Sequence, residues 1–336
     1  MARIRQEDYA YAVARIRAIE SKLLSQSRME RLLELSNPSD AAKLLIESGY
    51  GTDHTDNRDN YNFEALFSAE EKKVYDFLIE MIPDPLPVHL FMKRYDYLNA
   101  KLILKAEFLG VDISKSLSPM GTIKPERLLG YITDRKLNEL PDILREAVLE
   151  SLDSFSQTRD PQVIDLILDK ASYKSMMADA KATGETFLVE LVKRLIDAAN
   201  IRIFVRSKIL SMPKDFVKKA LIAGGTISEN QFDELSDQGT DKLFEILKSN
   251  GLESLASELS QALSRPEGLS EIEKILDDSI IRFMKGYKYV TLGIEPVIAY
   301  LFYKETEIKN ARLIVTGLMN RISQEIIKER LRLGYA

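Results

Sequence analysis

The sequence predicts an all-α protein made of three homologous helical domains. Apolar residues recur every three to four positions along most of the chain, which is the spacing of one face of a helix. Runs of alternating β-branched residues are scarce, and no Asn-Gly hairpin signal occurs. One polar pattern also occurs three times along the chain, which indicates internal duplication.

The first predicted helix spans 8–24. Its apolar stripe contains Tyr9, Val13 and Ile16. Similar spacing predicts further helices over 28–48, 69–82, 90–109, 125–152, 161–180, 186–212, 228–248, 252–263, 269–285 and 293–331. The 11 Pro and 15 Gly fall mainly between these segments, where helices end and turns form.

Composition limits the classes of protein that fit. At 336 residues, the chain is long enough for two or three domains with a buried core. A net charge of −5 argues against a nucleic-acid-binding protein, because such proteins carry a concentrated basic face. The absence of Cys excludes disulfides, thiolate nucleophiles and zinc sites with Cys ligands.

Two segments bear on the location of the protein. The N-terminal segment is charged throughout and lacks the apolar core of a signal peptide. The apolar-rich stretch 289–303 contains Glu295 and Pro296, and it is shorter than the roughly 20 residues of a spanning helix. We therefore expect a soluble cytoplasmic protein without a transmembrane segment, which is compatible with a place on a membrane complex.

The three copies of the polar pattern read KRYDYLNAKLIL from Lys93, RLIDAANIRIFV from Arg194 and KETEIKNARLIV from Lys304. In each copy a base is followed by an acid, an Asn, a second base and three apolar residues at fixed spacing. The acid, the Asn and the second base are Asp96, Asn99 and Lys101 in the first copy, Asp197, Asn200 and Arg202 in the second, and Glu307, Asn310 and Arg312 in the third.

A second similarity supports the duplication. Residues 31–46 resemble 127–142 and 231–246, and GTIKPERL at 121–128 matches GTISENQF at 225–232. The same order of segments therefore occurs three times.

From this order we predict three helical domains, at 1–117, 118–222 and 223–336. The Asp-rich segment 49–63 has no counterpart in the other two copies. It is expected to be an exposed insertion or a disordered loop.

The acid and the Asn of each copy share one helix face with Ile103, Phe204 or Ile314, because a helix advances about 100° per residue. Residues on this face should be buried, so the acid and the Asn should have polar partners. Two interpretations are open: three active or ion sites, or polar contacts that fix how one helix packs in each domain. The second is favoured, because three near-identical enzyme sites without a His, Ser or Cys nucleophile would be unusual.

Other signs of catalysis are missing from the sequence. It has no phosphate-binding loop, no dinucleotide-binding glycine pattern, and no HExxH or GxSxG motif. His54 and His89 have no second His at ligand spacing. The loop from Asp53 has Thr55 and Arg58 where a calcium loop has Asp or Asn and then Gly. We therefore predict no catalytic residue, no cofactor and no metal. A metal-dependent hydrolase centred on this loop and a helical scaffold of another assembly are the alternatives.

Three stretches carry a resemblance to a known family: YAYAVARIRAIESKLLSQSRMERLLELSNPSDAAKLLIESGYG near the N-terminus, RYDYLNAKLILKAEF in the first copy and YKETEIKNARLIVTGLMNRISQEIIKERLR near the C-terminus. Together they resemble the C subunit of the bacterial and archaeal rotary V/A-type ATPases, a family that includes the d subunit of the eukaryotic V-ATPase. The resemblance covers almost the whole chain.

This resemblance implies three similar helical domains around a pseudo-threefold axis, which together form a funnel. It implies a non-catalytic rotor subunit that caps the membrane proteolipid rotor ring and receives central-stalk subunits of the D and F types. The location it implies is peripheral, on the cytoplasmic face of the membrane. The sequence departs from a strict repeat at Glu307, which is longer than Asp by one methylene, so the third contact is expected to differ in detail.

Overall fold

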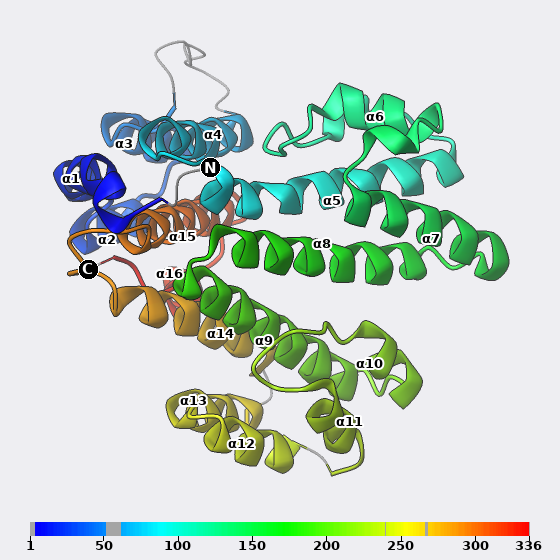
Figure 1. Cartoon of the computed structure of the whole chain (residues 1–336). Helices are drawn as coiled ribbons and strands as arrows, with labels where there is room; N and C mark the ends of the chain where they lie inside the picture. Colours follow the sequence, from blue (N-terminus) through cyan, green and yellow to red (C-terminus); the bar gives the residue numbers. More distant parts are fainter. Residues whose placement is uncertain (1–3, 52–61, 239, 266–267, 336) are drawn as a thin grey trace. The chain divides into compact units, whose positions relative to one another are not determined.

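The computed structural model describes residues 4–51, 62–238, 240–265 and 268–335, and all regular secondary structure in these ranges is helical (Figure 1). The prediction of an all-α protein is therefore confirmed for the described residues. The α-helices are α1 (Ala10–Ile19), α2 (Gln26–Glu34), α3 (Pro38–Glu47), α4 (Phe63–Met81), α5 (Leu86–Leu109), α6 (Pro125–Thr133), α7 (Asp142–Thr158), α8 (Gln162–Thr183), α9 (Thr186–Ile209), α10 (Lys214–Ala220), α11 (Glu229–Gln238), α12 (Thr240–Ser249), α13 (Glu253–Leu263), α14 (Gly268–Lys285), α15 (Glu295–Met319) and α16 (Gln324–Arg330). Short 3₁₀ turns are η1 (Gln6–Tyr9), η2 (Glu20–Lys22), η3 (Ser114–Ser116) and η4 (Leu137–Glu139).

Several predicted helices are divided in the structure. The segment 28–48 forms α2 and α3, because the Asn37 side chain caps the N-terminus of α3 and Pro38 is its first residue. The segment 293–331 forms α15 and α16, and Arg321 between them has a left-handed φ of 55°. The apolar spacing continues across both breaks, so it did not reveal them.

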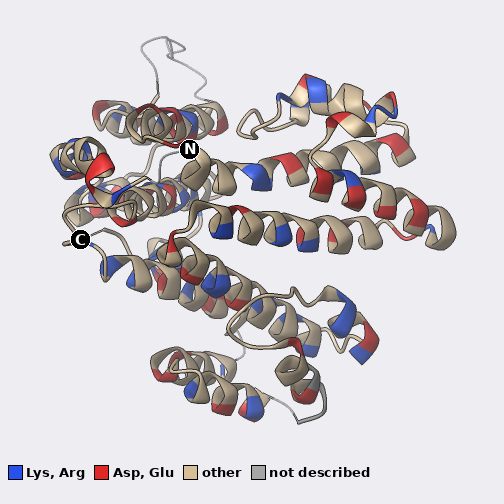
Figure 2. Ribbon diagram, viewed as in Figure 1, with Lys and Arg blue, Asp and Glu red and all other residues tan. Residues whose placement is uncertain are grey.

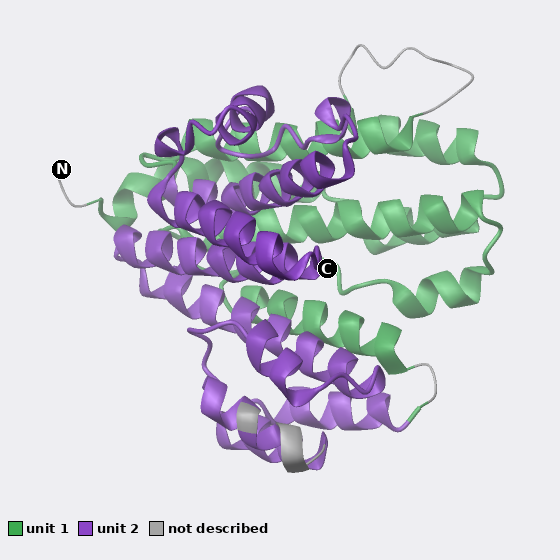
Figure 3. Cartoon of the chain, turned by 90° about the vertical axis from the view of Figure 1, so that its right-hand side faces the viewer, with its two compact units in different colours: residues 1–85, 265–336 green, residues 86–264 purple. Residues whose placement is uncertain are grey.

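The described part of the chain forms two compact units (Figure 3). Unit 1 consists of 1–85 and 265–336, and therefore combines segments from both ends of the chain. In it, α15 packs against α1, α2, α3, α4 and α14. Leu45, Phe67 and Ile308 belong to its buried apolar cluster, whose removal from water stabilises this packing.

Unit 2 consists of 86–264 and contains α5 to α13. Its helix α8 packs along α5, α7 and α9. Ile103, Leu144 and Leu168 lie in the core between α5, α7 and α8. The division into three domains at 117/118 and 222/223 stays a prediction.

The helices α5, α9 and α15 carry the three copies of the polar pattern, and all three end in the same way. A residue with left-handed φ stands eleven positions after each Asn: Gly110 (65°), Ser211 (52°) and Arg321 (55°). The N–H of the next residue donates to a carbonyl five residues earlier, as in a Schellman cap. These bonds join Val111 to Ala106 (3.1 Å), Met212 to Ser207 (2.9 Å) and Ile322 to Gly317 (2.9 Å). The helix termini therefore repeat together with the polar pattern.

Two further predictions concern the Asp-rich segment and membrane spanning. Most of the predicted insertion at 49–63, including His54, lies at 52–61, outside the described residues. Where helices are described, none combines the length and the apolar content that spanning a bilayer requires.

Candidate functional site

The acids and the Asn residues of the repeated pattern are buried in all three copies. Their exposed fractions are 2% for Asp96, 0% for Asn99, 4% for Asp197, 0% for Asn200, 5% for Glu307 and 3% for Asn310. Buried polar groups of this kind require hydrogen-bond partners. The partners determine what these residues do.

Each Asn pairs with both backbone groups of a single residue beyond the end of its helix. Asn99 Oδ1 accepts a hydrogen bond from the Ser118 N–H (2.8 Å), and Asn99 Nδ2 donates to the Ser118 carbonyl (2.8 Å). Asn200 makes the same two bonds with Ile222, both at 2.8 Å. The side-chain amide therefore holds the segment that follows the helix against the helix that carries the Asn. Its one accepting and one donating bond resemble the backbone pairing of neighbouring strands.

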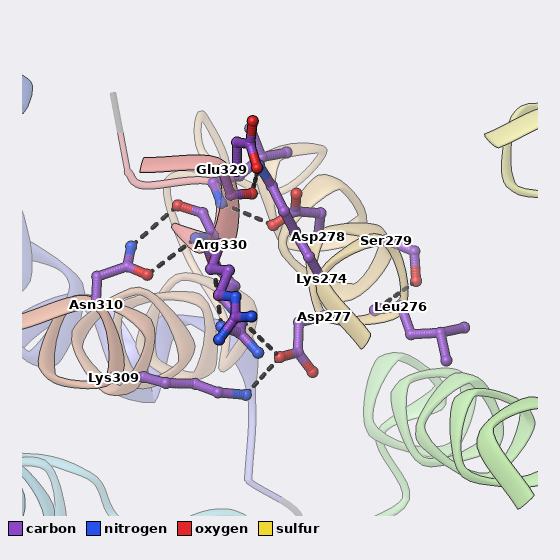
Figure 4. Close-up of polar contacts among 11 residues, drawn as sticks. Lys274, Leu276, Asp277, Asp278, Ser279, Lys309, Asn310, Glu329 and Arg330 are labelled. Carbon is purple, nitrogen blue, oxygen red and sulfur yellow. Dashed lines mark hydrogen bonds and ion pairs between the residues drawn. The ribbon is translucent and has the colours of Figure 1, made fainter. Parts of the chain in front are cut away.

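The third Asn repeats this contact near the C-terminus, as Figure 4 shows. Asn310 Oδ1 accepts from the Arg332 N–H (2.9 Å), and Asn310 Nδ2 donates to the Arg332 carbonyl (3.0 Å). On the other side of this segment, Arg332 Nε lies 3.1 Å from Asp277 Oδ2, which also accepts from Lys309. Asp278 Oδ1 accepts from the N–H of the residue after Arg332 (2.7 Å). The C-terminal segment is therefore bound to α15 and α14.

The first acid accepts hydrogen bonds from the segment that precedes α6. Asp96 Oδ2 accepts from the N–H (3.1 Å) and the hydroxyl (2.6 Å) of Thr122, and Asp96 Oδ1 accepts from the Ile123 N–H (3.0 Å). Burial raises the pKa of Asp96 above its usual value of 3.8, while these bonds and the Lys93 ammonium oppose the shift. Both carboxylate oxygens are engaged by the protein itself.

The second acid repeats the arrangement. Asp197 Oδ1 accepts from the Ile227 N–H (3.1 Å), and Thr226 donates through its hydroxyl and its N–H. Burial raises the pKa of Asp197 as well, and the hydrogen bonds and Arg194 lower it. The two sites thus match in both geometry and electrostatics.

A glycine stands directly before each Thr and lies against the acid. A Cβ on Gly121 would be 2.1 Å from Asp96 Oδ1, and a Cβ on Gly225 would be 2.3 Å from Asp197 Oδ1. No side chain fits at these distances, so the acid contact requires Gly at this position. This explains why Gly-Thr-Ile occurs in both copies.

The third acid has a different set of partners, which agrees with its longer side chain. Glu307 Oε2 accepts from the Leu24 N–H (2.6 Å), and Oε1 accepts from the Tyr50 hydroxyl (2.7 Å) and from Lys304 Nζ (2.6 Å). Lys304 Nζ also lies 2.9 Å from Glu70 Oε1, and Glu70 is buried too. Burial raises the pKa of Tyr50, and the neighbouring Glu307 raises it further. One buried ammonium therefore bridges two buried carboxylates in unit 1.

The backbone groups bound by the three acids occupy equivalent places. Ile123, Ile227 and Leu24 each stand two residues before the first residue of a helix, namely α6, α11 and α2. The acids of the first and second copies thus bind the segments that lead into α6 and α11. The third copy binds the N-terminal segment, so the series of contacts returns to its beginning.

The second base of the pattern faces a neighbouring helix. Lys101 Nζ lies 2.7 Å from Asp169 Oδ1 of α8, and Arg312 Nη2 lies 3.3 Å from Glu71 Oε1 of α4. Arg202 is half-buried at the equivalent position of α9. Such ion pairs orient helices but contribute at most about 1 kcal/mol each where they are exposed.

The geometry of these sites is that of packing contacts. The amides bind backbone groups and the acids bind backbone and side-chain donors of the protein. No group of three or more metal-ligating side chains occurs among the described residues. A groove of about 930 Å³ in unit 2 lies between α7, α8 and the segment 219–229, and none of the nine pattern residues lines it. The groove is mainly apolar, with Lys170, Lys174, Glu146 and Glu150 among its lining residues.

Sequence reasoning did not identify several residues of these contacts. The roles of Gly121 and Gly225 could have been suspected, because Gly-Thr-Ile follows the acid at a similar distance in two copies. Tyr50, Glu70 and Leu24 have no such signal, since they lie far from Glu307 in sequence and belong to no repeated motif.

Comparison with known proteins agrees with these observations. The model of the ATP synthase (C/AC39) subunit family matches residues 12–330. The C subunit of the V-type sodium ATPase of Enterococcus hirae is 26% identical over 95% of this chain and 97% of its own length. The C subunits of the A-type ATP synthases of Methanocaldococcus jannaschii and Pyrococcus horikoshii are 25% and 24% identical, over 96% of this chain and 86% and 89% of their own. Because the family match spans nearly the whole chain, this protein belongs to the ATP synthase (C/AC39) subunit family.

Proposed function

We propose that this chain is a non-catalytic rotor subunit of a V/A-type ATPase or ATP synthase, which links the central stalk to the membrane rotor ring and transmits torque between them. The family match over 12–330 carries this proposal. Relatives are named as subunits of a V-type sodium ATPase and of A-type ATP synthases. The proposed role therefore belongs to ion transport coupled to ATP hydrolysis or synthesis, at the cytoplasmic face of the membrane.

The repeated contacts support a closed arrangement of three similar helical domains. In a ring of three copies, each copy contacts the next and the third contacts the first. The acids follow this order, since Asp96 binds the segment before α6, Asp197 the segment before α11 and Glu307 the segment before α2. We therefore propose a funnel around a pseudo-threefold axis, with the stalk received inside it and the ring bound below it.

Rigidity is the mechanical property that this role demands, because a compliant link would lose rotation as internal twist. Asn99, Asn200 and Asn310 each accept one hydrogen bond from the segment after their helix and donate one to it. The two bonds together fix the position and the orientation of that segment. The three Asn side chains are buried, so water competes poorly for these bonds. We propose that these contacts stiffen the protein, which is a structural role for the nine pattern residues.

Co-isolation tests the proposed function. The tagged full chain should be recovered from membranes, extracted in mild detergent, together with a proteolipid ring and central-stalk subunits of the D and F types. Recovery in a stable assembly that contains neither the proteolipid ring nor the stalk subunits would favour the alternative function, a helical scaffold of another assembly. Saturable binding of a divalent cation in a calorimetric titration would favour the metal-dependent enzyme.

A further inference from the structure

The end of α9, the following turn and α10 form a surface, residues 206–219, which we call the basic tip. Its exposed charged residues are Arg206, Lys208, Lys214, Lys218 and Lys219, with Asp215 as the one acid. Figure 2 shows Lys and Arg positions along the last turns of α9 and on α10. Five bases and one acid give this surface a charge of +4 in a chain whose net charge is −5.

Exposed aliphatic side chains stand in the middle of these bases. Ile209 is 53% exposed and Leu210 is 69% exposed, and both directly precede the left-handed residue Ser211. They therefore project at the turn between the basic end of α9 and the basic helix α10. A surface of this kind combines positive charge with an apolar projection.

The other two copies show that the helix terminus does not need this charge. The equivalent residues 105–118 and 316–329 each contain two bases and two acids, so both segments are neutral. The same Schellman cap nevertheless forms in all three copies. Leu109 and Met319 are exposed at those ends as well, at 75% and 58%. The excess of bases is thus specific to the second copy.

We propose that the basic tip binds the surface of a membrane that contains anionic lipids. Lysines near such a surface are attracted to phosphate and carboxylate headgroups, and exposed aliphatic side chains can enter the boundary with the acyl chains. Four of the five bases are lysines, and the exposed apolar residues are aliphatic. Protein interfaces are instead depleted in Lys and enriched in aromatic residues and Arg. The contact goes beyond the proposed rotor function, which brings the chain to a membrane but does not require it to bind lipid.

Vesicle flotation of the purified full chain tests the proposal. The chain should float with vesicles of phosphatidylcholine and phosphatidylglycerol in equal parts, and not with vesicles of phosphatidylcholine alone. The triple variant Lys208→Gln, Lys214→Gln, Lys218→Gln should reduce the partition constant roughly a hundredfold, since each cation contributes roughly fivefold. High salt should weaken binding of the unaltered chain, because it screens exposed charges. Leu210→Ser should weaken the part of binding that persists in high salt.

A matched control separates the basic tip from overall charge. Lys115, Lys124 and Lys136 are exposed lysines of the same unit, and changing all three to Gln alters the net charge equally. This variant should bind anionic vesicles as the unaltered chain does. Circular dichroism during heating checks that both triple variants are folded.

Three results would overturn the proposal. They are no flotation of the unaltered chain with anionic vesicles, equal loss in the two triple variants, and unchanged flotation of the basic-tip variant. If the last result came with loss of binding to the detergent-purified rotor ring, the basic tip would be assigned to a protein contact. Co-isolation with ring and stalk is measured separately, so the rotor function stands or falls independently of lipid binding.

Discussion

Replacing Asn200 with Ala removes a side chain that satisfies both backbone groups of one buried residue. Asn200 is fully buried, and it accepts from the Ile222 N–H and donates to the Ile222 carbonyl at 2.8 Å each. Ile222 is only 4% exposed, so water does not readily replace the lost partners. In the variant, a buried donor and a buried acceptor are left unpaired.

The expected cost follows from these two groups. Each unsatisfied buried backbone group costs about 1–3 kcal/mol, which gives a total of about 2–6 kcal/mol. A water molecule in the space vacated by the amide would recover part of this. We therefore expect the free energy of unfolding to fall by about 2–4 kcal/mol.

Urea denaturation measures the global effect, and amide hydrogen exchange measures the local one. The Ile222 amide should exchange faster in the Asn200→Ala variant, while the Ser118 amide, held by Asn99 in another copy, serves as the internal control. Asn138→Ala, at an exposed position, should change stability by less than about 0.5 kcal/mol. An unchanged unfolding free energy together with unchanged exchange at Ile222 would refute the reasoning.

Three further predictions concern other residues of the repeated contacts. Gly225→Ala would place a Cβ 2.3 Å from the Asp197 carboxylate and should destabilise the chain by about 1–3 kcal/mol. The control Gly130→Ala lies in α6, where a Cβ meets open space, and it should be neutral or slightly stabilising. Thermal unfolding of both variants measures the difference, and equal destabilisation by the two would contradict the contact between Gly225 and Asp197. Lys304→Met should cost about 3–5 kcal/mol in urea denaturation, because it removes the ammonium that bridges the buried Glu70 and Glu307, and a neutral effect would contradict this. Asp197 has a raised pKa because of burial, so its contribution to stability is fully present below the usual 3.8 and is lost as the pH rises through the folded pKa. Asp197→Asn should therefore flatten the dependence of unfolding free energy on pH above 3.8, and an unaltered slope would contradict the assignment.

The helical fold and the buried face of the repeated pattern could be predicted from the sequence. Apolar spacing reports which face of a helix is covered, whatever covers it, and Ile103, Phe204 and Ile314 mark that face correctly. The same spacing runs through short breaks such as Asn37-Pro38, because both helices pack on one core. Helix boundaries were therefore less well predicted than helical character.

The partners of the pattern residues could not be predicted in this way. The Asn99 contact spans 19 residues of sequence, and the bond from Leu24 to Glu307 spans 283. Periodicity within one helix contains no information about such distances. The substitution of Glu for Asp at 307 did signal a different third contact, but not that the N-terminal segment would supply it.

Cross-linking mass spectrometry of the intact complex tests the central claim, that this chain connects the stalk to the rotor ring, most directly. Lysine-reactive cross-linkers should join this chain both to central-stalk subunits and to the cytoplasmic loops of the ring proteins, and in the same preparation. Cross-links to only one of these partners, or only to subunits that do not rotate, would contradict the proposed coupling role.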